Sequence, residues 1–160
     1  MGKIYIAYGS NMNLKQMESR CPTAEKIGIG KVQGYGLLFR GTPASAVATI
    51  EPDPDRCVDA LIWEIREKDE EALDRYEGVP TLYQKKMISV VMEDGTKTEG
   101  MVYIINSHYR FGIPSPEYYS AILEGYRENG IPEEGLIQAL LQTCDLVKEQ
   151  KKEPVQKMGM

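Results

Sequence analysis

The segment Ile29–Arg40, IGKVQGYGLLFR, is an apolar stretch interrupted by glycine at Gly30, Gly34 and Gly36. Glycine inside a strand usually marks a bulge, a sharp bend or a place where a second backbone approaches closely. Glycines repeated at this spacing therefore predict a strongly curved strand, of the kind found in barrels.

The segments around it also have the composition of strands, because they are short and rich in β-branched and aromatic residues. The first is Lys3–Tyr8 (KIYIAY), which is followed at once by Gly9-Ser10-Asn11. The sequence PDPD at 52–55 predicts a turn, and Asp94-Gly95 predicts a hairpin. Further strands are expected at residues 46–50, 57–65, 83–92 and 100–106.

Helix signals separate some of these strands. Residues 66–76 have carboxylates near their start and an apolar stripe, and Gly78 follows as a stop signal. Asn11 or Asn13 is suited to cap a short helix that ends at Cys21-Pro22. Two more helices are expected at residues 116–128 and 133–148.

These elements predict an α+β fold, namely a small bent or closed mixed β-barrel flanked by helices. Strands outnumber helices, and neither βαβ alternation nor an internal repeat is present. The 160 residues suit one domain, which we expect at residues 1–148. The polar residues 149–160 are expected to be a disordered tail.

Charge and cysteine content limit the classes of partner. With a formal net charge of -5, the chain has no electrostatic reason to bind nucleic acid or an anionic membrane. Cys21, Cys57 and Cys144 are widely spaced and form no Cys-x-x-Cys pair, which favours reduced thiols. No apolar run approaches the ~20 residues of a membrane span, and no signal core is present. We therefore expect a cytoplasmic protein with no nucleic-acid or membrane partner.

Most catalytic templates are absent from the sequence, including the dinucleotide-binding glycine motif, the P-loop and the nucleophile elbow. The single histidine, His108, lies in an aromatic segment and is expected to be a partly exposed loop residue. Two other features remain as candidates for a functional site.

The first candidate is the loop Tyr8-Gly9-Ser10-Asn11. A strand that turns into a helix N-terminus through these residues presents several backbone N–H groups in one direction, and such groups bind carboxylates or phosphates. The alternative is an ordinary strand-to-helix turn with an asparagine cap, and local physics leaves both interpretations open.

The second candidate is Glu77, in the last turn of the predicted helix and just before Gly78. The helix dipole disfavours a carboxylate there, and desolvation by apolar neighbours would raise its pKa further. A carboxyl group with a raised pKa is suited to act as a base near neutral pH. The alternative is an exposed helix-end residue that tolerates a small electrostatic penalty.

Several motifs, taken in order, resemble the γ-glutamylcyclotransferase-like superfamily. Tyr8–Asn11 after an N-terminal strand is similar to its signature loop. Residues 57–65 with Leu73–Val79 (LDRYEGV) resemble its central block, and Ser115–Tyr118 (SPEY) with Glu128–Pro132 (ENGIP) resembles its closing segment. Each motif alone is weak, but the ordered set, which covers residues 3 to about 135, is specific.

The resemblance implies a compact barrel flanked by helices, with a pocket at one end and neither a metal nor an organic cofactor. It implies that Glu77 is the catalytic acid/base. It also implies that the substrate glutamyl group is bound by Tyr8, Gly9, Ser10 and Asn11, with Tyr83 and Tyr118 lining the pocket.

The implied reaction is that of a γ-glutamylcyclotransferase. The α-amine of a small γ-glutamyl substrate attacks its own γ-carbonyl, which releases 5-oxoproline and a free amino acid or amine. One alternative is a cyclotransferase of the same fold for γ-glutamyl amines or for a biosynthetic γ-glutamyl blocking group. Another is a non-catalytic binding protein. The leaving group stays undetermined, and either a monomer or a homodimer is expected.

Overall fold

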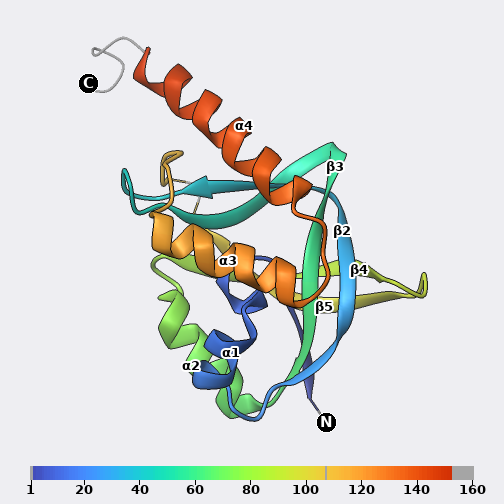
Figure 1. Cartoon of the computed structure of the whole chain (residues 1–160). Coiled ribbons are helices and arrows are strands. Elements are labelled where there is room, and N and C mark those ends of the chain that lie inside the picture. The colour runs from blue at the N-terminus through green and yellow to red at the C-terminus, as the bar shows by residue number, and fades with distance from the viewer. Residues whose placement is uncertain (1, 107, 153–160) are drawn as a thin grey trace.

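The computed structural model describes residues 2–106 and 108–152, and its five strands form a closed barrel in the order β1-β3-β2-β4-β5 (Figure 1). Most neighbouring strands are antiparallel, but β1 pairs with β5 in parallel, so the barrel is mixed. The predicted fold class is confirmed. The strands are β1 (Lys3–Ala7), β2 (Glu25–Arg40), β3 (Val47–Ile65), β4 (Tyr83–Met92) and β5 (Lys97–Ile105).

The glycine-interrupted segment forms most of β2, and this strand is curved as predicted (Figure 1). Its pairing with β3 shifts register between Lys26 and Gly28 and again between Gln33 and Tyr35. Gly30 lies where β2 meets β4, and a Cβ there would be 2.7 Å from Val90 Cγ2. The missing side chain therefore allows the contact between β2 and β4.

The predicted turn at residues 52–55 is wrong, because β3 runs without interruption from Val47 to Ile65. Gln33 pairs with Cys57 and Tyr35 pairs with Pro52, so residues 53–56 stand opposite the single residue Gly34. They form a large bulge and not a reversal of the chain. A bulge tolerates proline because its residues leave the hydrogen-bonded ladder.

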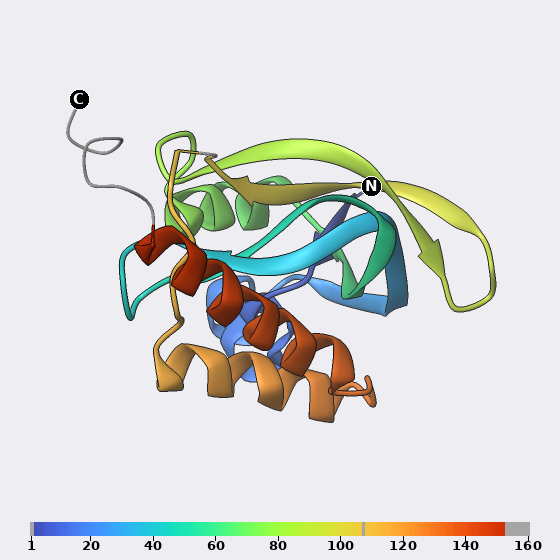
Figure 2. The ribbon, with the colours of Figure 1, turned by 90° about the horizontal axis from the view of Figure 1, so that it is seen from above.

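The helices lie outside the barrel, and Figure 2 shows α3 and α4 together on the side away from the β4–β5 hairpin. One contiguous cluster of buried apolar side chains joins the strands to these helices. Within the described residues, no helix is both long and apolar enough to span a membrane. The helices are η1 (Ser10–Met12), α1 (Leu14–Arg20), α2 (Glu67–Glu77), α3 (Pro116–Glu128) and α4 (Glu134–Lys151).

Helix α4 continues to Lys151, about one turn beyond its predicted end. The rest of the predicted tail, residues 153–160, lies outside the described residues. The three cysteines are free, and His108 is exposed, as expected for a loop histidine.

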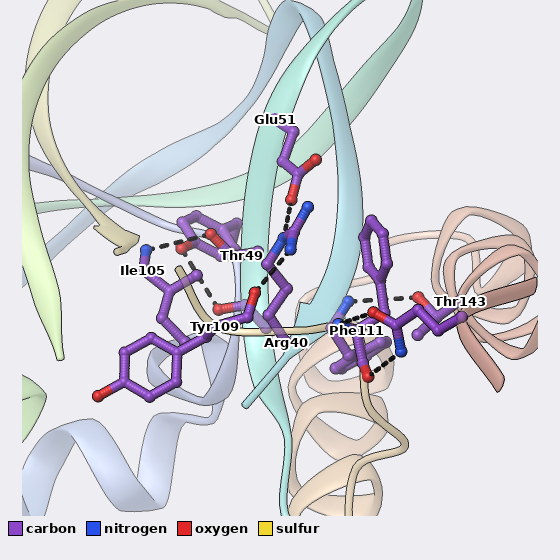
Figure 3. Close-up of polar contacts among 11 residues, drawn as sticks. Arg40, Thr49, Glu51, Ile105, Tyr109, Phe111 and Thr143 are labelled. Atoms are coloured by element: carbon purple, nitrogen blue, oxygen red, sulfur yellow. Dashed lines mark hydrogen bonds and ion pairs between the residues drawn. The ribbon is translucent and has the colours of Figure 1, made fainter. Parts of the chain in front are cut away.

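The loop between β5 and α3 is fastened to the barrel and to α4, as Figure 3 shows. The Arg40 guanidinium donates to the Glu51 carboxylate and, at 2.6 Å, to the Tyr109 carbonyl. The backbone of Phe111 and the side chain of Gln150 exchange two hydrogen bonds, at 2.8 and 3.0 Å. These contacts fix the segment that leads into α3, the helix that carries Tyr118.

Candidate active site

A cavity of about 210 Å³ opens where β1, α2, β3, β4 and α3 meet. All seven residues that the sequence analysis assigned to the site line this cavity, although they are separated by up to 110 positions along the chain (118 − 8). They are Tyr8, Gly9, Ser10, Asn11, Glu77, Tyr83 and Tyr118.

The loop after β1 leaves three backbone donors unused. Among the described residues, the N–H groups of Gly9, Ser10 and Asn11 donate no hydrogen bond. The next two N–H groups, of Met12 and Asn13, donate at 3.0 Å to the Gly9 and Ser10 carbonyls and so close η1. The loop therefore has adjacent donors available for an anionic group.

The asparagine cap of the first helix is provided by Asn13, whose side chain accepts from the Gln16 N–H at 3.1 Å. Asn11 has another role. Its Nδ2 donates to the Tyr5 hydroxyl at 2.8 Å, and its carbonyl accepts from Trp63 Nε1 at 3.1 Å. Asn11 is thus fixed to the barrel wall.

Helix α3 supports the loop from outside. Asn129 Nδ2 donates to the Met12 carbonyl at 2.9 Å, and Asn13 Nδ2 donates to the Ala121 carbonyl at the same distance. A Cβ at Gly125 would be 2.7 Å from the Met12 carbonyl carbon. The backbones of α3 and the loop can approach this closely because position 125 has no side chain.

Glu77 is the last residue of α2 and lines the cavity, half-buried. Gly78 then ends the helix in the left-handed conformation, with φ 66° and ψ 41°. The carboxyl group of Glu77 makes no hydrogen bond within the described part of the chain. Burial raises its pKa from 4.5 to about 7, although the positive charge of Arg20 opposes this effect. This placement is inconsistent with the alternative that Glu77 is an exposed helix-end residue.

The tyrosines of the cavity are organised around the peptide groups of Ala48 in β3. The Tyr83 hydroxyl donates to the Ala48 carbonyl at 2.7 Å, and the Tyr8 hydroxyl donates to the Tyr103 carbonyl. In contrast, the Tyr118 hydroxyl accepts from the Ala48 N–H at 3.0 Å. Burial raises the pKa of Tyr8, Tyr83 and Tyr118 above the usual value, so all three stay protonated near neutral pH.

The sequence analysis missed several residues of the site. Tyr5 lies on β1, and the two-residue alternation of a strand would have placed it inward only with the barrel register known. Ala48 is a small residue without functional side-chain chemistry. Arg20, which donates to the loop from outside the cavity, gave no local signal. The other lining residues that were missed are Ile6, Val47, Tyr76, Leu82 and Tyr103.

The donor set does not form a metal site. Residues 2–106 and 108–152 hold no group of three or more His, Cys, Asp or Glu side chains placed to bind a metal ion. The cavity instead combines one carboxyl group with hydroxyls and free N–H groups, which suits the binding and proton transfer of a small polar molecule.

The family model described as Gamma-glutamyl cyclotransferase, AIG2-like, matches residues 5–121. The chain belongs to this family. The matched range includes all seven predicted site residues, from Tyr8 in the loop to Tyr118 in α3.

Curated relatives carry the same name. The chain is 30% identical to the Mus musculus γ-glutamylcyclotransferase over 139 residues, which is 82% of this chain and 73% of the mouse protein. It is 28% identical to the Homo sapiens γ-glutamylcyclotransferase over 137 residues, which is 81% of this chain and 72% of the human protein.

A solved structure of a γ-glutamyl cyclotransferase is also similar, with a TM-score of 0.78 and 27% identity. The match covers 84% of this chain and 83% of that chain. The family, the fold and the enzyme class predicted from the sequence are therefore confirmed.

Proposed function

We propose that this γ-glutamylcyclotransferase family member closes a γ-glutamyl group to 5-oxoproline, with Glu77 as acid and base. One observation carries the proposal. A half-buried carboxyl group without a hydrogen-bond partner among the described residues, with a pKa of about 7, shares a cavity with a loop of unused N–H donors. The first group is suited to proton transfer, and the second is suited to hold a carboxylate.

The substrate α-carboxylate is assigned to the N–H groups of Gly9, Ser10 and Asn11. These donors belong to a loop that the barrel and α3 hold rigidly, through the contacts of Asn11 with Tyr5 and of Asn129 with Met12. Rigid donors lose little freedom when they bind an anion, which favours one orientation of the substrate. Orientation matters here because a well-placed intramolecular reaction gains roughly 7–11 kcal/mol.

Glu77 is assigned both proton transfers. As a carboxylate it takes a proton from the substrate α-ammonium, and the free amine then attacks the γ-carbonyl carbon. The new C–N bond closes the five-membered ring, and the bond to the departing nitrogen breaks. Glu77 returns its proton to that nitrogen, then takes the second proton from the ring nitrogen and gives it to the released amine. In total two protons leave the α-nitrogen and the departing amine takes up two, so the reaction needs no net acid or base.

Tyr118 is assigned to the oxygen of the γ-carbonyl, on which negative charge develops. The hydroxyl protons of Tyr8 and Tyr83 are already donated to backbone carbonyls. Tyr118 accepts a hydrogen bond from Ala48 instead, so its own proton is free to be donated. Hydrogen-bond direction therefore separates Tyr118 from Tyr83, two tyrosines to which the sequence analysis gave the same role.

The amine that departs is not identified by these residues, which account only for the glutamyl half of the substrate. γ-Glutamyl amino acids are the first choice, and γ-glutamyl amines or a biosynthetic blocking group are the alternative. Rates of 5-oxoproline release from a panel of both kinds of substrate would separate them. Release from amines alone would favour the alternative.

The decisive test of the chemistry is the variant Glu77→Gln, which keeps the size of the side chain but removes the base. We expect its kcat on γ-glutamyl substrates to fall at least about 100-fold. Activity within a few-fold of wild type would refute the assignment. If wild type bound glutamate or 5-oxoproline but released no product from any donor, a non-catalytic binding protein would be the better explanation. Cytoplasmic location and a monomeric or homodimeric state stay predictions.

A further inference from the structure

Arg20, the last residue of α1, connects the two halves of the site. Its Nη1 donates to the Ser10 hydroxyl at 3.3 Å and to the Asn11 side-chain carbonyl. Its Nη2 donates to the Tyr76 hydroxyl. The guanidinium carbon also lies 3.5 Å from the centre of the Tyr76 ring, which is the geometry of a cation–π contact.

These contacts join the loop that is assigned to the substrate carboxylate to the helix end that carries Glu77. Ser10 and Asn11 belong to the loop assigned to the substrate carboxylate, and Tyr76 directly precedes Glu77 in the last turn of α2. Arg20 itself is half-buried and does not line the cavity, so it acts through its neighbours.

We propose that Arg20 is a positioning residue of this reaction, which fixes the Tyr8–Asn11 loop against the C-terminal turn of α2. The proposal rests on the function assigned to the cavity above. A guanidinium is required because it holds several acceptors in a fixed plane and stacks on an aromatic ring, whereas an ammonium is a point charge.

The charge of Arg20 has a second consequence for Glu77. Besides Glu77, the titratable side chains that line the cavity are tyrosines, so the charge that acts on Glu77 comes from Arg20. Its effect is to lower the pKa of Glu77 against the larger effect of burial. Burial raises the pKa of five of these tyrosines, so they stay protonated near neutral pH. They are Tyr5 on β1, Tyr8 in the loop after β1, Tyr83 on β4, Tyr103 on β5 and Tyr118 on α3.

The test compares Arg20→Gln, which removes both charge and geometry, with Arg20→Lys, which keeps the charge alone. In both variants we expect kcat/KM to fall roughly 10- to 100-fold, because the loop loses its fixed position. The pKa of Glu77 should rise by roughly 0.5–1 unit in Arg20→Gln and stay close to wild type in Arg20→Lys. It is measured by the NMR titration of the carboxyl carbons in labelled protein, with the Glu77 signal assigned by its absence in Glu77→Gln.

Arg75→Gln is the matched control. Arg75 lies in the same turn of α2 and is exposed, and its side chain makes no hydrogen bond or ion pair within the described residues. It should leave both kcat/KM and the Glu77 titration as in wild type. Circular dichroism first establishes that each variant is folded.

The proposal would be overturned if both Arg20 variants, folded, kept kcat/KM within about threefold of wild type. It would also be overturned if Arg20→Gln left the Glu77 titration unchanged, since a merely structural role predicts that result. The titration needs no turnover. An inactive wild type would therefore refute the proposed function and still leave the link between Arg20 and Glu77 measurable.

Discussion

The Tyr118 hydroxyl accepts a hydrogen bond from the backbone N–H of Ala48, across 70 positions of the sequence. The carbonyl of the same Ala48 receives the Tyr83 hydroxyl at 2.7 Å. One residue of β3 thus determines which tyrosine has a proton left for the substrate and which does not.

This relationship predicts different effects for two matched substitutions. Tyr118→Phe removes a donor that acts on the developing oxyanion, so we expect kcat to fall roughly 100-fold. Tyr83→Phe removes a hydrogen bond to a buried carbonyl, so we expect a loss of roughly 1–2 kcal/mol in unfolding free energy and a much smaller change in kcat. Steady-state kinetics and urea unfolding of both variants test this, and equal losses of kcat would contradict it.

The dependence of activity on pH follows from Glu77. As the base, it works only when ionised, and its pKa in the folded protein is about 7. We therefore expect kcat/KM to rise with pH and to level off above an apparent pKa of about 7. A profile that is already flat at pH values well below this would mean that another group takes the proton.

The stability of the protein should depend on the same carboxyl group. Stability should fall as the pH rises, whereas activity should increase. Folding raises the pKa of Glu77 from 4.5 to about 7, so the ionised form is disfavoured in the folded state. The contribution of Glu77 to the free energy of unfolding is thus retained below pH 4.5 and lost as the pH rises through about 7. The loss is of the order of 1–3 kcal/mol.

Glu77→Gln should consequently raise the melting temperature more in mildly alkaline than in mildly acidic buffer. Differential scanning calorimetry of wild type and variant at both pH values measures this. An equal shift at the two values would show that burial does not disfavour the charge.

The contact between α3 and the loop gives a prediction about glycine. In Gly125→Ala the new Cβ would be 2.7 Å from the Met12 carbonyl carbon and 2.8 Å from the Asn13 nitrogen, both backbone atoms. We expect a loss of roughly 1–3 kcal/mol in unfolding free energy, together with reduced kcat because the loop moves.

Gly135 in α4 is the matched control, since a Cβ there meets nothing closer than Asp59 Oδ2 at 3.5 Å. Gly135→Ala should leave activity as in wild type and keep or raise stability, by up to about 1 kcal/mol. A stable, active Gly125→Ala variant would show that the loop does not need the close contact.

Local sequence signals were sufficient to predict the bounds of several strands and helices. Strand β4 and helix α3 have the bounds that alternation, the Pro116 start and the chain-breaking Gly130 predicted. The location of Glu77 in the last turn of α2 also followed from the sequence, because a helix end and its glycine cap are encoded within a few residues.

Residues 52–55 show where such signals fail. Two prolines and two aspartates are typical of a turn, yet Pro52 pairs with Tyr35 and the other three lie in a bulge of β3 opposite Gly34. The choice between a turn and a bulge depends on the partner strand, since only the register of β2 shows which residues leave the ladder.

The sequence by itself determined the family, the barrel with flanking helices, and seven of the residues that line the cavity, because these follow from local patterns and from motifs in a recognisable order. Only the tertiary structure decided how those residues act. It placed Ala48 between the tyrosines, Arg20 between the loop and Tyr76, and Glu77 where burial raises its pKa. Hydrogen-bond direction and desolvation arise from groups far apart in the chain, so they exist only once the barrel has closed.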